Sequence, residues 1–447
     1  MPHDMPAATT AAGPHSGPDV ERVLTPGGLE AWLVNAPSVP LLAVAFSFKG
    51  GAAADPAGSE GLSRMLAGLL DEGAGELDSL AFRTELEDLA IRLHFTAERD
   101  ALAGRLMTLG ENRDRAFELL RLSLAEPRFD AEPVERIRQQ ITSDLQRRRT
   151  DPNTVSGRVW FAHAFAGHAY GRPTQGTIEA IRRVQPAELR AYVEKRLARD
   201  NLVIGVAGDI TAAELAPLLD RAFAHLPALA DLPPLLPATP ATGATLVTPM
   251  TIPQSVVTFG LPGIPRDDPD YYAAYVANYI IGGGGFASRL IEEVREKRGL
   301  AYSVYSQLAD AELAPLWMGG VATRNDQVAQ SIEVIRAELK RMAEGDIGET
   351  DLANARTYLT GSFPLRFTSN ESVARMLVGM QVADLGIDYL ERRNALIEAV
   401  GLADVARASR RLFSAEPLFS VVGDPTGLDG ATRLDPVVAA NGHGGKG

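Results

Sequence analysis

The chain has 447 residues, 45% of them hydrophobic and 23% charged, which is the size and balance of a soluble globular protein with two domains. Its formal net charge of -13 argues against nucleic acid as a partner and against docking on an anionic membrane. The absence of cysteine excludes disulfides, thiolate catalysis and cysteine-ligated zinc.

Both ends of the chain are predicted to be tails. Residues 1–20 are polar and rich in Pro, Ala and Thr, and they lack the basic start and apolar run of a signal peptide. We therefore expect a periplasmic protein if a leader has been removed and a cytoplasmic one otherwise. Residues 431–447 form the second tail, and no stretch between the two is apolar for long enough to span a membrane.

The first half, residues 21–224, mixes strand and helix signals. Residues 30–51 predict strands, and the Asp55–Pro56 step predicts a helix start with Asp as the cap and Pro at the first helical position. Two long amphipathic helices joined by a short turn are predicted around residues 120–141, and a closing strand over 202–211. Between the Asp-Pro step and this pair lies a short helix whose apolar positions recur at the 3.6-residue period, namely Leu62, Met65, Leu66, Leu69 and Leu70.

A proline-rich segment, His225–Leu246, has little helical or strand periodicity and predicts an extended linker between two domains. The second domain, residues 247–430, repeats the order of the first at nearly the same spacing. It has a second Asp-Pro step at Asp268–Pro269, a second helix pair around 335–359 and a second closing strand with the shared ending VxGDxT.

A repeat of this size predicts a duplicated domain rather than a short solenoid repeat. Strands mixed with helix pairs, without strict alternation, favour a sheet with helices on one face. We therefore predict an α+β fold of two duplicated α/β domains, each a mainly antiparallel sheet with helices packed on one face.

The most specific stretch is Ile280–Leu308, which reads IIGGGGFASRLIEEVREKRGLAYSVYSQL. Its glycines, Gly282–Gly285, are not followed by the Lys-Ser/Thr of a phosphate loop, so we give phosphate binding little weight. As a whole the stretch resembles the C-terminal half of the insulinase/pitrilysin family of zinc peptidases. The resemblance extends from about Val20 to Thr426. Such proteins are built from duplicated α/β domains that form half of a clam shell, which agrees with the repeat.

The resemblance implies a role for an arginine and a tyrosine seven residues apart. In the family this pair reaches an active site formed largely by another domain or subunit, and here it corresponds to Arg295 and Tyr302. The tyrosine would stabilise charge on the attacked carbonyl oxygen, and the arginine would hold a substrate carbonyl. Arg298 and Tyr305 have the same spacing, but Tyr302 directly follows the Gly-Leu-Ala turn, as in the family. The structural alternative is an arginine that caps its helix or pairs with a neighbouring glutamate, and a tyrosine half-buried in a strand.

The same resemblance implies that the first half has lost the zinc ligands and the general base of active members. Active members carry HxxEH on the short helix, where two histidines bind zinc and the glutamate is the general base; a further glutamate ligand comes later in the chain. Here the corresponding residues are Arg64, Ala67 and Gly68, with the distal position near Asp144. Arginine would repel a cation, and alanine and glycine offer no ligand. The resemblance therefore implies no metal in this chain, and we expect a salt bridge between Arg64 and Asp144 in its place.

Histidines elsewhere do not restore a metal site. The one close pair in the body of the chain, His163 and His168, is five residues apart, which does not place both rings well on one helical face. We expect both to be ordinary packing or loop residues.

In function, the chain is similar to inactive-domain subunits of bacterial heterodimeric peptidases and of the mitochondrial processing peptidase. The resemblance implies a metal-free subunit that pairs with an HxxEH-bearing, zinc-containing subunit, contributes Arg295 and Tyr302, and acts on peptides or small unfolded proteins. A homodimer is the alternative assembly for the isolated chain. The second interpretation is a peptide-binding or structural scaffold without a catalytic role, and the third is a self-sufficient peptidase with a relocated metal site.

Overall fold

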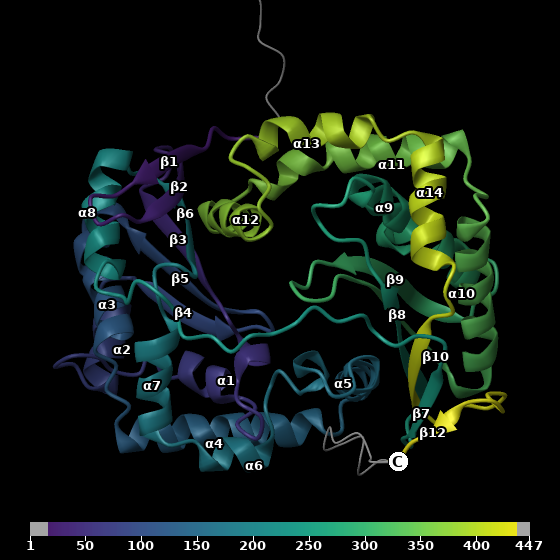
Figure 1. The fold of residues 1–447 in the computed structure, drawn as a ribbon, viewed down its shortest axis with the longest axis horizontal. Helices are drawn as coiled ribbons and strands as arrows, with labels where there is room; N and C mark the ends of the chain where they lie inside the picture. The colour runs from purple at the N-terminus through teal and green to yellow at the C-terminus, as the bar shows by residue number, and fades with distance from the viewer. Residues whose placement is uncertain (1–16, 436–447) are drawn as a thin grey trace, which may run out of the picture.

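The computed structural model describes residues 17–435 and contains two six-stranded sheets side by side (Figure 1). The first has the order β1-β2-β6-β3-β5-β4 and the second the order β12-β7-β11-β8-β10-β9. The strands of the first are β1 (Glu21–Leu24), β2 (Glu30–Asn35), β3 (Leu41–Lys49), β4 (Arg92–Ala97), β5 (Ala101–Leu109) and β6 (Leu202–Gly208). Those of the second are β7 (Thr245–Pro249), β8 (Gln254–Pro262), β9 (Ala301–Ala309), β10 (Leu316–Arg324), β11 (Leu418–Gly423) and β12 (Thr432–Arg433).

The duplication is visible strand by strand. The order β2-β6-β3-β5-β4 corresponds position for position to β7-β11-β8-β10-β9. Within each set of five, one pair is parallel, β2 with β6 and β7 with β11, and the other pairs are antiparallel. Only the sixth strand differs, because β1 adds to β2 antiparallel and β12 adds to β7 parallel. The predicted fold class is confirmed.

Most helices cover one face of the sheet in their own half, and one helix of each half lies on the sheet of the other half. Those of the first half are α1 (Leu62–Ala67), α2 (Ser79–Asp88), α3 (Arg113–Ala125), α4 (Ala131–Arg148), α5 (Pro152–Ala164), α6 (Ile178–Arg183), α7 (Pro186–Arg196) and α8 (Ala212–Phe223). Those of the second are α9 (Tyr271–Asn278), α10 (Val328–Ala343), α11 (Glu349–Gly361), α12 (Asn370–Val382), α13 (Tyr389–Glu398) and α14 (Leu402–Phe413), with two π-helices, η4 (Tyr279–Gly283) and η6 (Ile291–Glu296). The two predicted helix pairs are α3 with α4 and α10 with α11.

The opposite face of the second sheet is covered by α5, a helix of the first half. Trp160 of α5 is fully buried, and its Nε1 donates to the carbonyl oxygen of Leu418 at 3.0 Å. Ser156 Oγ donates to the carbonyl oxygen of Ser420 at 2.8 Å. Both acceptors belong to β11, so α5 is tied to the middle of the sheet built by the other half.

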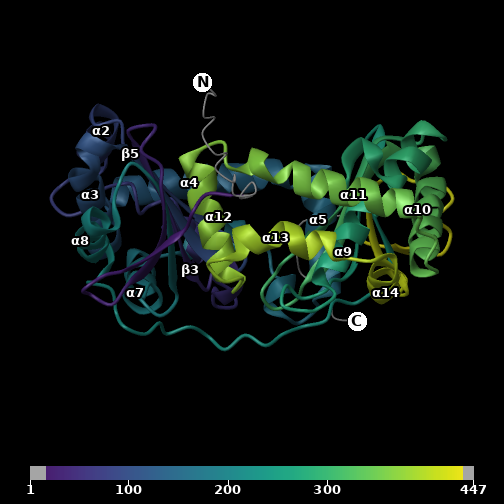
Figure 2. The ribbon, with the colours of Figure 1, turned by 90° about the horizontal axis from the view of Figure 1, so that it is seen from above.

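The first sheet receives α12 from the second half in return (Figure 2). Gln381 Nε2 donates to the carbonyl oxygen of Ile204 in β6 at 2.8 Å, and Asn370 Nδ2 to that of Leu41 at 3.0 Å. The approach is close at Gly205, where a Cβ would lie 2.4 Å from the carbonyl oxygen of Ala374. Neither helix is among the elements expected from the sequence, and nothing in the sequence indicates that the two are exchanged between the halves.

The two Asp-Pro steps do not start helices, contrary to the prediction. Pro56 lies in a turn ahead of α1, and Asp55 reaches forward to accept hydrogen bonds from the backbone N–H groups of Gly61 and Ser63 at 3.0 and 3.1 Å. In the second half, α9 begins at Tyr271, beyond the step. Neither aspartate is therefore the adjoining cap: Asp55 acts across a turn, and the side chain of Asp268 accepts from the N–H of Asp270 at 2.8 Å, ahead of α9.

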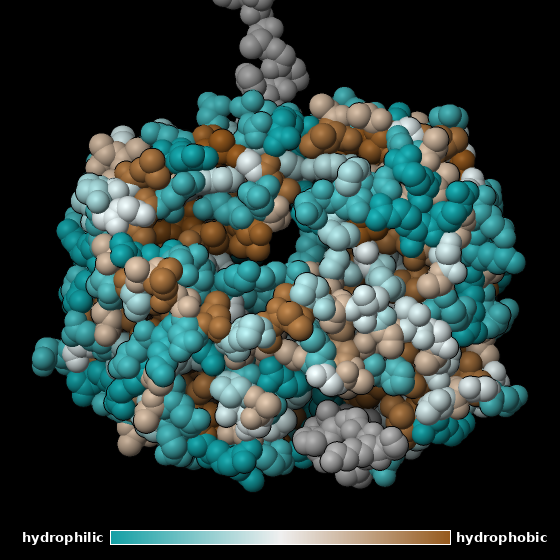
Figure 3. Space-filling model, in the orientation of Figure 1, coloured by the Kyte–Doolittle hydropathy of each residue, from teal (hydrophilic) through white to brown (hydrophobic). Residues whose placement is uncertain are grey.

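Residues 224–244 connect α8 to β7 without a helix or strand and cross from one half to the other (Figure 2). On the face drawn in Figure 3 the surface is largely hydrophilic, and a hollow opens between the halves. Within residues 17–435 no helix has the length and apolar character that crossing a membrane requires.

Candidate functional site

Arg64 of α1 and Asp144 of α4 form the predicted salt bridge. Arg64 Nη2 lies 2.6 Å from Asp144 Oδ2, and its Nη1 donates to the carbonyl oxygen of Gln175 at 3.1 Å. The two side chains are only 19% and 21% exposed. Asp144 also accepts hydrogen bonds from Arg148 Nε at 2.7 Å and from Arg147 Nη2 at 3.2 Å. One carboxylate therefore serves three guanidinium groups.

The electrostatics of this cluster follow from burial and crowding. Burial lowers the pKa of Arg64, the hydrogen bond and charge of Asp144 oppose that effect, and the positive charge of Arg148 adds to it. Burial would raise the pKa of Asp144, but hydrogen bonds from Arg148 and Arg64 outweigh it, and the pKa lies below its usual value. Asp144 is therefore a carboxylate at neutral pH, and its capacity to accept is largely used by the arginines.

The remaining positions on α1 offer nothing to a metal. Ala67 is buried, and Gly68 packs so closely on α4 that a Cβ would lie 3.2 Å from Cγ2 of Ile137. A side chain at position 68 would therefore require Ile137 to shift by a few tenths of an ångström. Within residues 17–435 no three His, Asp or Glu side chains come together in an arrangement that could hold a metal ion. The residues at this place do not fit the zinc that the family resemblance associates with the helix.

The start of α1 is held by a buried acid that the sequence analysis misassigned. Asp55 is 2% exposed, and the hydroxyl of Ser63 also donates to it at 3.1 Å. Burial raises its pKa to about 6, although the hydrogen bonds from Gly61 and Ser63 act in the opposite direction. Arg172 Nη1 donates to the backbone carbonyl of Asp55 at 2.7 Å and fixes the same turn from the other side.

The second candidate pair, Arg295 and Tyr302, lies where the π-helix η6 turns into β9. Gly299, at a φ of +61°, donates its N–H to the carbonyl oxygen of Arg295 at 2.9 Å and closes the turn. Tyr302 is 84% exposed, and its hydroxyl has no hydrogen-bond partner in the described chain. The guanidinium carbon of Arg295 lies 4.9 Å from the ring centre of Phe286, itself 75% exposed. Arg295 is half-buried and makes no ion pair with any described residue, so the chain itself holds neither polar group by a hydrogen bond or ion pair.

The neighbouring residues with the same spacing are engaged elsewhere. Arg298 Nη1 donates to the carbonyl oxygen of Glu293 at 2.8 Å and pairs with its carboxylate, which also binds Lys297 Nζ at 2.6 Å. The ring of Tyr305 lies across β10, where a Cβ on Gly320 would be 3.1 Å from the tyrosine hydroxyl. Glu293 thus pairs with Lys297 and Arg298 and not with Arg295, unlike in the structural alternative.

His168 is the loop residue that the sequence analysis predicted. Its Nδ1 accepts a hydrogen bond from the N–H of Tyr170 at 3.1 Å. The ring proton is therefore assigned to Nε2, which lies 2.9 Å from the carbonyl oxygen of Leu236 and donates to it. His163 is exposed on α5.

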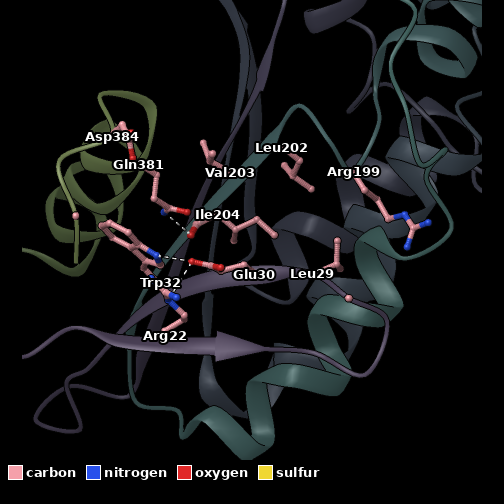
Figure 4. Close-up of a pocket in the computed structure, with 12 residues that line it drawn as sticks. Arg22, Leu29, Glu30, Trp32, Arg199, Leu202, Val203, Ile204, Gln381 and Asp384 are labelled. Carbon is pink, nitrogen blue, oxygen red and sulfur yellow. Dashed lines mark hydrogen bonds and ion pairs between the residues drawn. The ribbon is translucent and has the colours of Figure 1, made fainter. Parts of the chain in front are cut away.

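A cavity of about 410 Å³ lies away from both candidate pairs (Figure 4). Its walls are β1, β2 and β6 of the first half and the end of α12 from the second. Inside it, Glu30 accepts a hydrogen bond from Trp32 Nε1 at 3.0 Å and pairs with Arg22 at 3.2 Å, while Gln381 belongs to the opposite wall. Nothing in the sequence indicates this cavity, because its two walls meet only through the exchange of α12.

Family models match both halves of the chain. Residues 31–178 match the model described as Insulinase (Peptidase family M16), and residues 183–359 match the one described as Peptidase M16 inactive domain. The chain is 26% identical to the "Non-peptidase homolog YmxG" of Helicobacter pylori over 76% of this chain and 78% of that protein. It is also 26% identical to an "Uncharacterized zinc protease" of Streptomyces coelicolor, over 96% and 95% of the two chains.

A solved structure agrees in fold. The peptidase M16 inactive domain from Pseudomonas fluorescens is 25% identical in sequence and matches with a TM-score of 0.84 over 93% of this chain and 99% of that chain. Two of these three proteins are named as inactive or non-peptidase forms. Those names accord with the residues found here at positions 64, 67 and 68.

Proposed function

Because the chain belongs to the insulinase family of peptidases, family M16, as a non-catalytic member, we propose that it is the metal-free subunit of a zinc-dependent peptidase. The subunit pairs with a separate HxxEH-bearing chain, and the two together cleave peptides or small unfolded proteins. The observation that carries the proposal is the accessibility of Arg295 and Tyr302. Both present their polar groups without a hydrogen bond or ion pair to the described part of the chain.

The proposed chemistry of this pair follows from peptide hydrolysis. Attack of water on a peptide carbonyl places negative charge on its oxygen, and a hydrogen bond aimed at that oxygen lowers the barrier. Tyr302 donates that hydrogen bond. Arg295 binds the carbonyl oxygen of a neighbouring peptide unit through its planar guanidinium. The metal and the general base belong to the partner, because α1 of this chain carries the Arg64–Asp144 pair where they would lie.

The test is a reconstitution. Hydrolysis of an unstructured fluorogenic peptide and zinc content are measured for this protein alone, for an HxxEH-bearing M16 protein of the same organism alone, and for their mixture. We expect activity in the mixture only, with the zinc bound to the partner. Tyr302→Phe and Arg295→Ala in the mixture should each lower kcat by about 10²- to 10³-fold, the usual effect of losing one such donor.

Tyr305→Phe is the matched control, since this tyrosine is half-exposed on the same strand and should leave kcat within about twofold. An active mixture that is indifferent to Tyr302→Phe and Arg295→Ala would make the chain a scaffold. Stoichiometric zinc and peptide cleavage by this protein alone would contradict the interpretation of Arg64, Ala67 and Gly68.

A further inference from the structure

Two of the three arginines around Asp144 have guanidinium N–H groups that donate to no described residue. Arg148 uses Nε and Arg147 uses Nη2 for the carboxylate. The other guanidinium nitrogens of both have no partner among residues 17–435. The side chains of Arg147 and Arg148 are 73% and 43% exposed, so these donors are accessible. An incoming anion would meet two unfilled guanidinium edges next to one another on the last turn of α4.

The net charge of the cluster also favours an anionic ligand. Arg64, Arg147 and Arg148 share one carboxylate, which leaves positive charge uncompensated on the surface of a protein whose net charge is -13. The nearby carboxylate of Glu179 lies 3.8 Å from Arg149, so that pair adds no net charge. A local excess of one sign raises the local concentration of ligands of the opposite sign.

We propose that this arginine cluster binds a carboxylate of the peptide substrate, either an acidic side chain or the C-terminal carboxylate. The inference rests on the proposed function, since it names the class of peptide that the subunit holds. Guanidinium groups bind carboxylates through paired N–H donors in a planar arrangement, which is the arrangement left open on Arg147 and Arg148.

The experiment measures binding of fluorescein-labelled nonapeptides to the isolated full-length protein by fluorescence polarisation. Three peptides are compared: one with glutamate side chains and an amidated end, one neutral with a free C-terminal carboxylate, and one neutral and amidated. We expect one or both carboxylate peptides to bind at least tenfold more tightly than the neutral amide, with affinity falling as salt is raised. The first two peptides separate side-chain from C-terminal recognition, and competition by inorganic phosphate separates both from general anion binding.

Two variants should act in opposite directions. The double variant Arg147→Gln/Arg148→Gln should weaken binding of the carboxylate peptides at least tenfold and leave the neutral amide unchanged. Asp144→Asn removes the competing carboxylate and should tighten binding about two- to fivefold. Arg324→Gln, a charge neutralisation at an exposed pair in the second half, is the control and should change nothing.

Equal binding of all three peptides, no binding up to 1 mM, or displacement by phosphate as strong as by peptide would each overturn the proposal. So would an unchanged affinity in the double arginine variant or a loss of affinity in Asp144→Asn. The protein is tested without a partner, so this result is independent of the reconstituted peptidase activity. Carboxylate-selective binding without reconstituted activity would contradict only the shared-site proposal. Reconstituted activity without carboxylate selectivity would contradict only the proposal for the arginine cluster.

Discussion

Replacing Asp144 by Asn should cost more stability than replacing its partner Arg64 by Met. After Asp144→Asn, Arg64 keeps the carbonyl oxygen of Gln175 but loses its counter-charge, and the positive charge of Arg148 stays nearby. After Arg64→Met, Asp144 still accepts hydrogen bonds from Arg148 and Arg147. The first change therefore leaves an uncompensated cation and the second leaves a paired anion.

The magnitude follows from burial. Breaking a fully buried ion pair by removing one partner costs about 3–5 kcal/mol, whereas an exposed pair contributes about 1 kcal/mol or less. Both side chains are about four-fifths buried. Between these limits, we expect Asp144→Asn to lower the unfolding free energy by about 2–3 kcal/mol and Arg64→Met to lower it by about 1 kcal/mol. The double variant should cost about 1–2 kcal/mol less than the sum of the two, because both remove the same interaction.

Urea unfolding of the full chain, followed by circular dichroism and tryptophan fluorescence, measures these free energies. The pKa of Asp144 is lowered in the folded protein, so its contribution is present above the ordinary carboxyl pKa of about 4 and is lost as the pH falls through the lowered value. The difference in unfolding free energy between the wild type and Asp144→Asn should therefore disappear at acidic pH. Equal costs for the two single variants, or strict additivity in the double variant, would refute the reasoning.

Three further predictions concern other parts of the molecule. The pKa of Asp55 is raised to about 6, so the native state holds its proton longer than the unfolded chain does. The contribution of Asp55 to the unfolding free energy should therefore fall by about 3 kcal/mol between pH 4 and 6, and urea unfolding of Asp55→Asn should lack this loss relative to the wild type. Phe286→Ala removes the ring beside Arg295 and should raise the KM of the reconstituted peptidase about two- to fivefold with kcat unchanged, whereas Phe286→Tyr should match the wild type. Gly205→Ala places a Cβ 2.4 Å from a backbone oxygen of α12 and should cost about 1–3 kcal/mol in thermal unfolding. Gly379→Ala, where a Cβ meets nothing within 4 Å, is its control and should not destabilise.

Much of the architecture could be predicted from the sequence because the chain contains it twice. The two helix pairs and the two closing strands recur in the same order, and each copy supports the interpretation of the other. The loss of the metal ligands could be predicted as well, since Arg64, Ala67 and Gly68 occupy one stretch whose neighbours resemble the family. The contact with Asp144 followed from the same alignment.

The exchange of helices could not be predicted in this way. Apolar periodicity identifies the buried face of a helix but not the sheet that covers it. The Asp-Pro steps failed for a related reason. A cap inferred from adjacency assumes that the helix starts at once, whereas Asp55 acts across a turn of several residues. The cavity beside Trp32 depends on the exchange and was missed with it.

The reciprocal placement of α5 and α12 sets an order of events during synthesis. The outer face of the first sheet, with Trp32 and Ala207, waits for α12, which is translated roughly 160 residues after β6, or about 10–30 s later at ordinary elongation rates. During that interval a nascent chain carries an uncovered apolar sheet face, and α5 has no sheet to cover. We therefore expect the first half to depend on chaperones until the second half emerges. A truncated gene product that ends before Asn370 should accumulate as insoluble protein, however complete its own strands are.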